Sequence, residues 1–242
     1  MRYLMTFSYD GTNYNGYQKQ PNKNTIQDNI EHALKTISNK DITIHSSGRT
    51  DAHVHAINAK AHFDLDKDLE IYKLKKALNS LINDDIYIKD IKVVNDDFHA
   101  RFDVKEKIYM YKINIGEYNP IDRNYIYQYN KQLDTFKIKE ATKYFIGEHN
   151  FKSFTKTDET KDDFIRTIYD INVNVDNNII ILEFRGNGFL RYMIRNIVGT
   201  LIEVGEGKVD PKEIKDIIEK EDRKEAYKTA PPHGLYLKDV NY

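Results

Sequence analysis

The sequence predicts an α+β protein made of two ferredoxin-like domains with mixed or antiparallel sheets. Strand-like and helix-like segments follow the order β-α-β-β-α-β in the first half, which is the order of a ferredoxin-like unit. The second half repeats that order loosely. At 242 residues the chain is long enough for two medium-sized domains. We therefore expect an N-terminal domain over 1–103 and a C-terminal domain over 104–242.

The elements of the first half have local signals of their own. Arg2–Tyr9 alternates like a strand and ends at the turn signal Asp10-Gly11. A polar loop over 12–23 precedes a helix over 26–37, which Asn24 or Thr25 can cap. The other elements expected here are strand 41–46, strand 56–63, helix 69–82 packing through Leu74, Leu78 and Leu81, and strand 86–94.

The second half is expected to begin with a strand over 105–115. The elements that follow are a loop or short strands over 119–132, helix 135–146 with Phe136 among its packing residues and Gly147 as C-cap, a lysine- and aspartate-rich loop after Phe154, strands 167–175 and 179–184, the very apolar helix 189–204, a short helix opened by Asp210-Pro211 and ending near Glu219, and strand 234–242.

Composition excludes several classes of protein. The chain is 40% hydrophobic, which argues against global disorder, and it has no cysteine for a disulfide or thiolate metal site. No apolar run reaches the length of a membrane span or a signal peptide core, so a cytoplasmic protein is expected. The net charge of −1 argues weakly against nucleic-acid binding but leaves room for a basic cleft.

One stretch, Gly48-Arg49-Thr50-Asp51, stands out between two expected strands. Polar connections of this kind are where proteins place reactive side chains. The carboxylate of Asp51 can act as a nucleophile, a general base or an ion-pair partner. The alternative is that Arg49 and Asp51 brace a turn, as most loop Arg/Asp pairs do.

A second pair of charges lies on the apolar helix expected over 189–204. Arg191 and Arg195 are one turn apart there, and cations on an otherwise buried helix require partners. The partner is either any nearby acid or Asp51 of the other domain, whose carboxyl a guanidinium would keep ionised.

Other catalytic and cofactor patterns are missing from the sequence. It has no phosphate-cradling GxxxxGK[ST], no GxGxxG after a strand and no GxSxG elbow, so no nucleotide cofactor is expected. His45, His53, His55 and His62 do not follow a known metal-ligand spacing, and no metal is expected either.

Several ordered motifs make the chain resemble the tRNA pseudouridine synthase A family over nearly its whole length. Residues 48–56, Gly-Arg-Thr-Asp-Ala-His-Val-His-Ala, are similar to the family signature G-R-T-D-x-G-V-H-A. The other matching stretches are 9–18, 98–102 with Tyr109 downstream, 147–151, 187–199 and 230–236.

The resemblance implies an isomerase that converts uridine to pseudouridine in tRNA, at positions 38 to 40 of the anticodon arm. It implies that Asp51 is the nucleophile and that Arg195 pairs with it. It further implies that Arg49 holds the nucleotide out of its stack and that Tyr109 stacks on the base. Leu235 would line the uracil pocket, and Arg101 would also bind the substrate. The family fold implies two domains around a central basic cleft, and a homodimer without cofactors.

Two departures from the family pattern matter. His53 replaces the signature glycine, which a backbone with positive φ would tolerate better than most substitutions. Tyr17 replaces a tryptophan and is expected to keep an aromatic platform. They leave open an enzyme with another RNA target. A non-catalytic RNA-binding protein and a protein–protein module are the competing classes.

Overall fold

The computed structural model describes residues 1–66, 69–156 and 163–242. The chain forms two compact units, Met1–Lys105 with Tyr236–Tyr242, and Glu106–Leu235. The lysine- and aspartate-rich loop expected after Phe154 lies partly outside the described residues. Among those residues, no helix is both long enough and apolar enough to span a bilayer.

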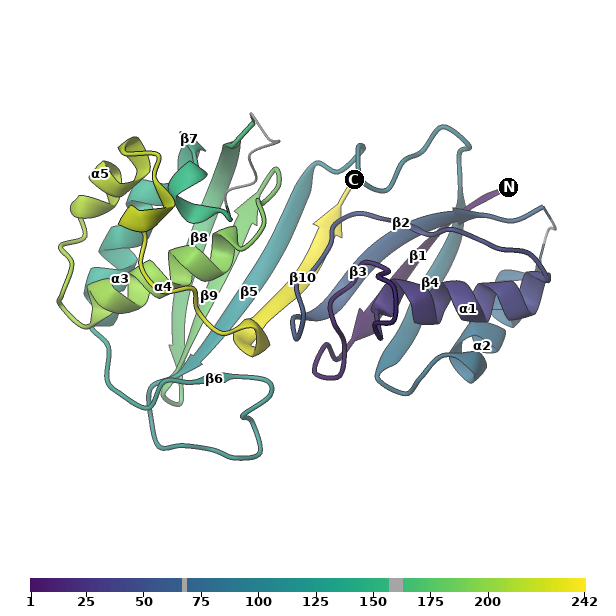
Figure 1. The fold of residues 1–242 in the computed structure, drawn as a ribbon, viewed down its shortest axis with the longest axis horizontal. Helices are drawn as coiled ribbons and strands as arrows, with labels where there is room; N and C mark the ends of the chain where they lie inside the picture. Colours follow the sequence, from purple (N-terminus) through teal and green to yellow (C-terminus); the bar gives the residue numbers. More distant parts are fainter. Residues whose placement is uncertain (67–68, 157–162) are drawn as a thin grey trace. The chain divides into compact units, whose positions relative to one another are not determined.

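The first unit has the expected order of elements and confirms the α+β class. They are β1 (Arg2–Tyr9), α1 (Ile26–Ser38), β2 (His45–Ser46), β3 (His55–Asp64), α2 (Ile71–Leu81) and β4 (Ile86–Val94). Strand β1 lies between β3 and β4 and is antiparallel to both, while β2 is antiparallel to β3. Helices α1 and α2 contact each other (Figure 1). This order and these pairings make a ferredoxin-like unit.

Helix α1 shows how the sequence specifies one of these elements. Ile26, Ile30 and Leu34 recur at helical spacing and are fully buried. The Thr25 hydroxyl caps the first turn by accepting from the backbone N–H of Asp28 at 3.4 Å. Asn39 adopts the left-handed conformation, with φ of 58°, and ends the helix.

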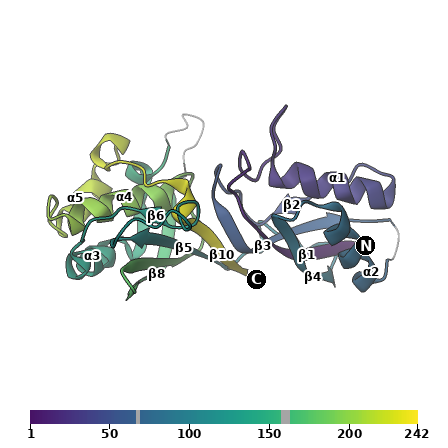
Figure 2. The same ribbon diagram turned by 90° about the horizontal axis from the view of Figure 1, so that it is seen from below.

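The second unit is built around the long strands β5, β8 and β9. Its elements are β5 (Glu106–Asn114), β6 (Tyr127–Gln128), α3 (Thr135–Thr142), η1 (Lys143–Phe145), β7 (Gly147–Asn150), η2 (Lys152–Phe154), β8 (Ile165–Asp176), β9 (Ile179–Gly186), α4 (Met193–Gly205), α5 (Glu213–Glu219), η3 (Arg223–Glu225) and η4 (Pro232–Gly234). Strand β9 is antiparallel to both β5 and β8, and β8 pairs with β7. Figure 2 shows helices α3, α4 and α5 gathered beside these strands. Because β6 and β7 add to the expected pattern, the second unit only partly repeats the first.

The chain ends on β10 (Leu235–Asn241), which runs parallel to β3 through the pairs Tyr236↔His55 and Leu237↔Ala56. This pairing groups residues 236–242 with the first unit, whereas the sequence predicts a single division at 103/104. The division into domains at that point stays a prediction.

Helix α4 begins later than the sequence indicates. Tyr192 has φ of 65°, a left-handed conformation that cannot continue a helix, so α4 starts at Met193 instead of Phe189. Arg191 therefore lies before the helix, and the expected face shared with Arg195 is wrong.

Hydrophobic periodicity also misplaces some side chains. Leu81 is 46% exposed and Phe136 is 87% exposed, although both were expected to pack. Leu81 is the last residue of α2 and Phe136 is the second residue of α3, so each lies at an end of its helix.

Three expected boundaries are wrong for local reasons. The strand expected over 41–46 is reduced to the two residues of β2. Gly147, with φ of 110°, is the first residue of β7 and does not cap a helix. Helix α5 starts at Glu213 and not at Pro211, but Asp210 keeps the contacts of an N-cap: its Oδ1 accepts from the backbone N–H of Lys212 at 2.9 Å, and its own N–H donates to Glu213 Oε1 at 2.9 Å.

Candidate active site

The strongest candidate site is the signature loop, residues 48–54, which connects β2 to β3. Within it Arg49 is exposed, Thr50 is buried and Asp51 is half-buried. A half-buried carboxylate on a short loop between strands can reach a bound molecule while the sheet holds its backbone.

A tight turn follows the carboxylate. The Asp51 carbonyl accepts from the backbone N–H of Val54 at 3.3 Å, with Ala52 and His53 at the centre of the turn. His53 has φ of 63°, whereas Ala52 is not among the residues with positive φ. This is the pattern of a type II turn, whose third position favours glycine. The backbone at His53 thus has the positive φ at which histidine is tolerated better than most residues.

The signature loop is braced by the first loop, residues 10–18. The Thr50 carbonyl accepts from the backbone N–H of Tyr17 at 3.1 Å, and the Tyr14 carbonyl accepts from that of His53 at 3.3 Å. The Thr50 hydroxyl shares a buried 2.7 Å hydrogen bond with the hydroxyl of Tyr9, at the end of β1. These bonds fix the backbone on both sides of Asp51.

Two glycines allow the two loops to approach this closely. A Cβ atom on Gly11 would lie 2.1 Å from the Val54 carbonyl oxygen. A Cβ atom on Gly16, which has φ of 95°, would lie 3.0 Å from the Thr50 carbonyl oxygen. A side chain at either position would push the signature loop away.

The base of the signature loop is supported by His55, which is buried at the start of β3. Its Nδ1 accepts from the backbone N–H of Gly11 at 3.1 Å, and its ring stacks on Tyr236 at 4.8 Å. Asp10 lies 3.1 Å from the same Nδ1. Because that nitrogen accepts the hydrogen bond from Gly11, the approach of Asp10 is a close contact and not an ion pair.

Tyr17 does not provide the aromatic platform expected from the sequence. Its ring is 2% exposed and packs against Phe7 at 6.4 Å between ring centres. Burial raises the pKa of its hydroxyl. Tyr17 is therefore a core residue under the first loop. Arg49, by contrast, lies at the surface and donates to Gln18 Oε1 at 2.6 Å.

Three further candidates lie in the second unit. Tyr109 is on β5, 8% exposed, with its ring edge-to-face against Phe189 at 5.3 Å. Leu235 is 6% exposed at the start of β10. Arg195 lies in the first turn of α4 and donates from Nε to the Ala230 carbonyl at 2.8 Å.

The segment that leads to Leu235 is held firmly in place. The Arg195 carbonyl accepts from the backbone N–H of Ala230 at 3.0 Å, so Arg195 and Ala230 are joined twice. The hydroxyl of Tyr111 donates to the Pro231 carbonyl at 2.7 Å. A Cβ atom on Gly199 would lie 1.7 Å from the Lys228 carbonyl oxygen, so this chain segment passes directly over α4.

Arg101 belongs to a different part of the first unit. Its backbone N–H donates to His99 Nδ1 at 3.1 Å, and its guanidinium lies 5.8 Å from the centre of the exposed Phe102 ring. Thus Asp51 and Arg49 share one loop, Arg101 lies with a cluster of histidines, and the other candidates lie in the second unit.

That histidine cluster consists of His45, His62 and His99, and one nitrogen of each ring lies within 4.8 Å of the others. The ring of His45 stacks on that of His62 at 4.8 Å. Burial, followed by the charges of His45 and Arg2, lowers the pKa of His62 to about 4, and burial also lowers the pKa of His99. Both rings are therefore neutral at pH 7.

The hydrogen bonds of this cluster oppose metal binding. Histidine ligands usually donate their second ring N–H to a carbonyl or carboxylate. Here Nδ1 of His62 accepts from the backbone N–H of Ala100 at 3.1 Å, and Nδ1 of His99 accepts from that of Arg101. Each neutral ring then carries its proton on Nε2, where a metal would have to bind. The hydrogen-bond direction at Nδ1 is therefore the reverse of that in a typical histidine metal site.

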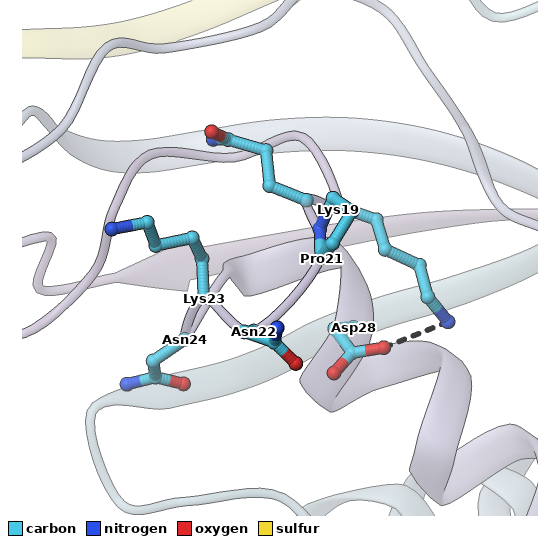
Figure 3. Close-up of a pocket in the computed structure, with 7 residues that line it drawn as sticks. Lys19, Pro21, Asn22, Lys23, Asn24 and Asp28 are labelled. Carbon is cyan, nitrogen blue, oxygen red and sulfur yellow. Dashed lines mark ion pairs between the residues drawn. The ribbon is translucent and has the colours of Figure 1, made fainter.

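A hollow on the surface lies next to the first loop, between residues 19–24 and the start of α1 (Figure 3). Lys19 forms a 2.7 Å ion pair there with Asp28. The rest of the lining is mainly lysine and amide side chains. The hollow contains no residue of the signature loop, and we assign no catalytic role to it.

Comparisons with known proteins give a consistent result. A family model described as tRNA pseudouridine synthase matches residues 5–103 and 141–242. A protein of Bacillus cereus named tRNA pseudouridine synthase A 1 is 44% identical over 243 residues, which cover 100% of this chain and 98% of that protein. Proteins named tRNA pseudouridine synthase A from Caldicellulosiruptor saccharolyticus and Caldicellulosiruptor bescii are 44% and 45% identical, over 99% of this chain and 98% of each relative.

Proposed function

We propose, because the chain belongs to the tRNA pseudouridine synthase family, that it converts uridine to pseudouridine in tRNA. The observation that carries the proposal is the half-buried Asp51 carboxylate at the head of a turn, with the backbone of Thr50 and His53 bonded to the first loop. A carboxylate held in this way is suited to nucleophilic catalysis, since it can form and release a covalent adduct.

The proposed reaction is an isomerisation that needs no other reactant. Attack by Asp51 forms a covalent bond to the target nucleotide, and the bond between C1′ of the ribose and N1 of uracil is cleaved. The base then turns, C5 bonds to C1′, the bond to Asp51 breaks and restores the carboxylate, the proton on C5 is lost, and N1 gains a proton. No electron is gained or lost, so the chemistry requires no redox cofactor.

We assign supporting roles to other residues. Arg195 is proposed to pair with Asp51 and hold its carboxyl ionised. The bond from Arg195 Nε to the Ala230 carbonyl, at 2.8 Å, supports this role because it restricts the orientation of the guanidinium. Arg49, whose exposed guanidinium can pair with phosphate, is proposed to hold the flipped nucleotide.

The remaining contacts to substrate are proposed for three residues. Tyr109 would stack on the target base, and Leu235 would line the uracil pocket. Arg101, exposed on the first unit, would contact the RNA backbone. The anticodon arm as target, positions 38 to 40, is part of the proposal, as are a homodimer, a cytoplasmic location and a cleft between the domains.

The test compares wild type with Asp51→Asn on unmodified tRNA transcripts, with pseudouridine mapped at each nucleotide. We expect pseudouridine in the anticodon arm with wild type, and a loss of about 10³-fold or more with Asp51→Asn while tRNA binding persists. The control is Asp97→Asn, which removes an exposed carboxylate from the same unit and should keep full activity.

The outcomes separate the competing classes. Pseudouridine elsewhere in the tRNA would retain the enzyme and overturn the anticodon target. Salt-dependent tRNA binding without any product would favour a non-catalytic RNA-binding protein. If the protein neither binds tRNA nor forms pseudouridine, a protein–protein module would be favoured. A mass close to twice that of the chain in light scattering is expected for the homodimer.

A further inference from the structure

We propose that His53 is a positioning residue that holds the turn of Asp51 against the first loop. The inference rests on the proposed function, because it concerns the same carboxylate. It begins from a strained conformation: His53 has φ of 63° in a turn where glycine would fit without cost. Residues other than glycine are strained in this region, although histidine is tolerated better than most. Such strain is typical of functional sites.

The side chain of His53 makes a contact that glycine cannot make. Its Nδ1 lies 2.8 Å from the Thr12 carbonyl oxygen. Since a carbonyl only accepts, Nδ1 must carry the proton and donate it. The backbone N–H of His53 donates separately to Tyr14, and that bond would remain with glycine. The imidazole is therefore the specific link between the turn and Thr12.

The acceptor end of this link is itself fixed. Asp10 Oδ1 accepts from both the backbone N–H of Thr12, at 2.9 Å, and its hydroxyl, at 2.6 Å. The Thr12 carbonyl is thus presented by a closed turn at the end of β1. Through His53, the position of the Asp51 turn is tied to this strand.

The bond also predicts how the link responds to pH. Nδ1 donates in the neutral ring and in the imidazolium alike, so protonation of His53 does not break it. A general base or a charged phosphate contact at the same residue would instead change with the charge of the ring. The shape of the pH profile therefore separates positioning from these other roles.

The experiment uses three substitutions at His53 in the full chain. His53→Asn keeps a donor on the atom attached to Cγ and tolerates positive φ. His53→Gln moves the donor one bond farther out, and His53→Gly removes it and relieves the strain. We expect His53→Asn to keep kcat within about twofold, and the other two to lower kcat about 5- to 10-fold with KM within about twofold. The pH profile should keep its shape in all three.

A second readout does not depend on activity. Amide hydrogen exchange at residues 50–54 should be faster in His53→Gly and His53→Gln than in wild type and His53→Asn. Asn39→Gly is the matched control, because Asn39 also has positive φ, 58°, but lies at the end of α1. It should leave both exchange in the loop and kcat unchanged.

Three results would overturn the proposal. The first is a His53→Gly variant with wild-type kcat and wild-type exchange in the loop. The second is a loss of kcat in His53→Asn equal to that in the other two variants, and the third is a pH profile whose shape changes when the imidazole is replaced. If wild type makes no pseudouridine, the proposed function fails, while the exchange measurement still decides whether His53 holds the turn.

Discussion

Two regions of the first unit use the imidazole ring in opposite ways. In the signature loop, Nδ1 of the exposed His53 donates to the carbonyl of Thr12. In the histidine cluster, Nδ1 of His62 and of His99 accepts from a backbone N–H. In the neutral ring, Nε2 therefore has a lone pair in His53, whereas it carries the proton in His62 and His99.

The backbone group that bonds to Nδ1 thus decides which ring nitrogen of a histidine carries the proton. A carbonyl beside Nδ1 leaves a ring that tolerates either charge, whereas an N–H beside Nδ1 favours the neutral ring. Burial acts in the same direction on His62. Histidine thus links two loops through a hydrogen bond at His53, and it forms a buried neutral ring at His62.

The largest expected effect comes from a substitution at Gly11, where the first loop contacts the signature loop. In Gly11→Ala the new Cβ would lie 2.1 Å from the Val54 carbonyl oxygen, so the first loop and the signature loop must separate. We expect a loss of about 3 kcal/mol in the free energy of unfolding, measured by urea denaturation, together with loss of pseudouridine formation. In Gly188→Ala the nearest atom is 3.9 Å away, and stability should be unchanged.

The next largest effect is expected in the pH dependence of stability, and it comes from the histidine cluster. The pKa of His62 falls from 6.5 to about 4 on folding because the ring is buried. Between these values the unfolded chain binds the proton and the folded chain does not, so stability should fall by about 3 kcal/mol as pH drops from 6.5 to 4, and then level off. His62→Gln should flatten this part of the curve. His32→Gln, which changes an exposed ring on α1, should not.

A smaller effect is expected from the buried bond beneath the signature loop. Thr50→Val removes the partner of the Tyr9 hydroxyl, a 2.7 Å bond. We expect a loss of about 1 kcal/mol in stability. A double-mutant cycle with Tyr9→Phe should show that the two losses are not additive. Additive losses would mean that the two hydroxyls do not interact.

The smallest effect is expected at the surface of the same loop. Gln18→Ala removes the acceptor of the Arg49 guanidinium, but both side chains are exposed. The free energy of unfolding should change by less than about 0.5 kcal/mol. A larger loss in thermal or urea denaturation would show that the exposed bond helps to hold the loop.

Much of the fold could be predicted because its signals are local. The buried face of α1 and its Thr25 cap are visible as apolar spacing and one hydroxyl. The start of α4 was not predictable in this way, since the left-handed Tyr192 depends on its surroundings. Phe136 shows the other limit: periodicity marks an apolar residue but does not reveal whether another layer covers it.

The candidate site could be predicted in part. Gly48–Asp51 was found from its spacing and its resemblance to a signature. The bracing by Gly11, Gly16 and Tyr14 was not, because these contacts join segments about 40 residues apart and only the folded chain brings them together. Tyr17 was misjudged, since an aromatic residue in a motif looks the same in sequence whether it faces RNA or the core.

The parallel pairing of β10 with β3 has a consequence for how the chain is made. Residues 236–242 leave the ribosome only after all of 106–235 has been synthesised, yet they belong to the first unit. Until then the His55–Ala56 edge of β3 lacks its partner, and His55 lacks the ring of Tyr236. The nascent first unit therefore has an open strand edge beside its signature loop until residues 236–242 have been translated.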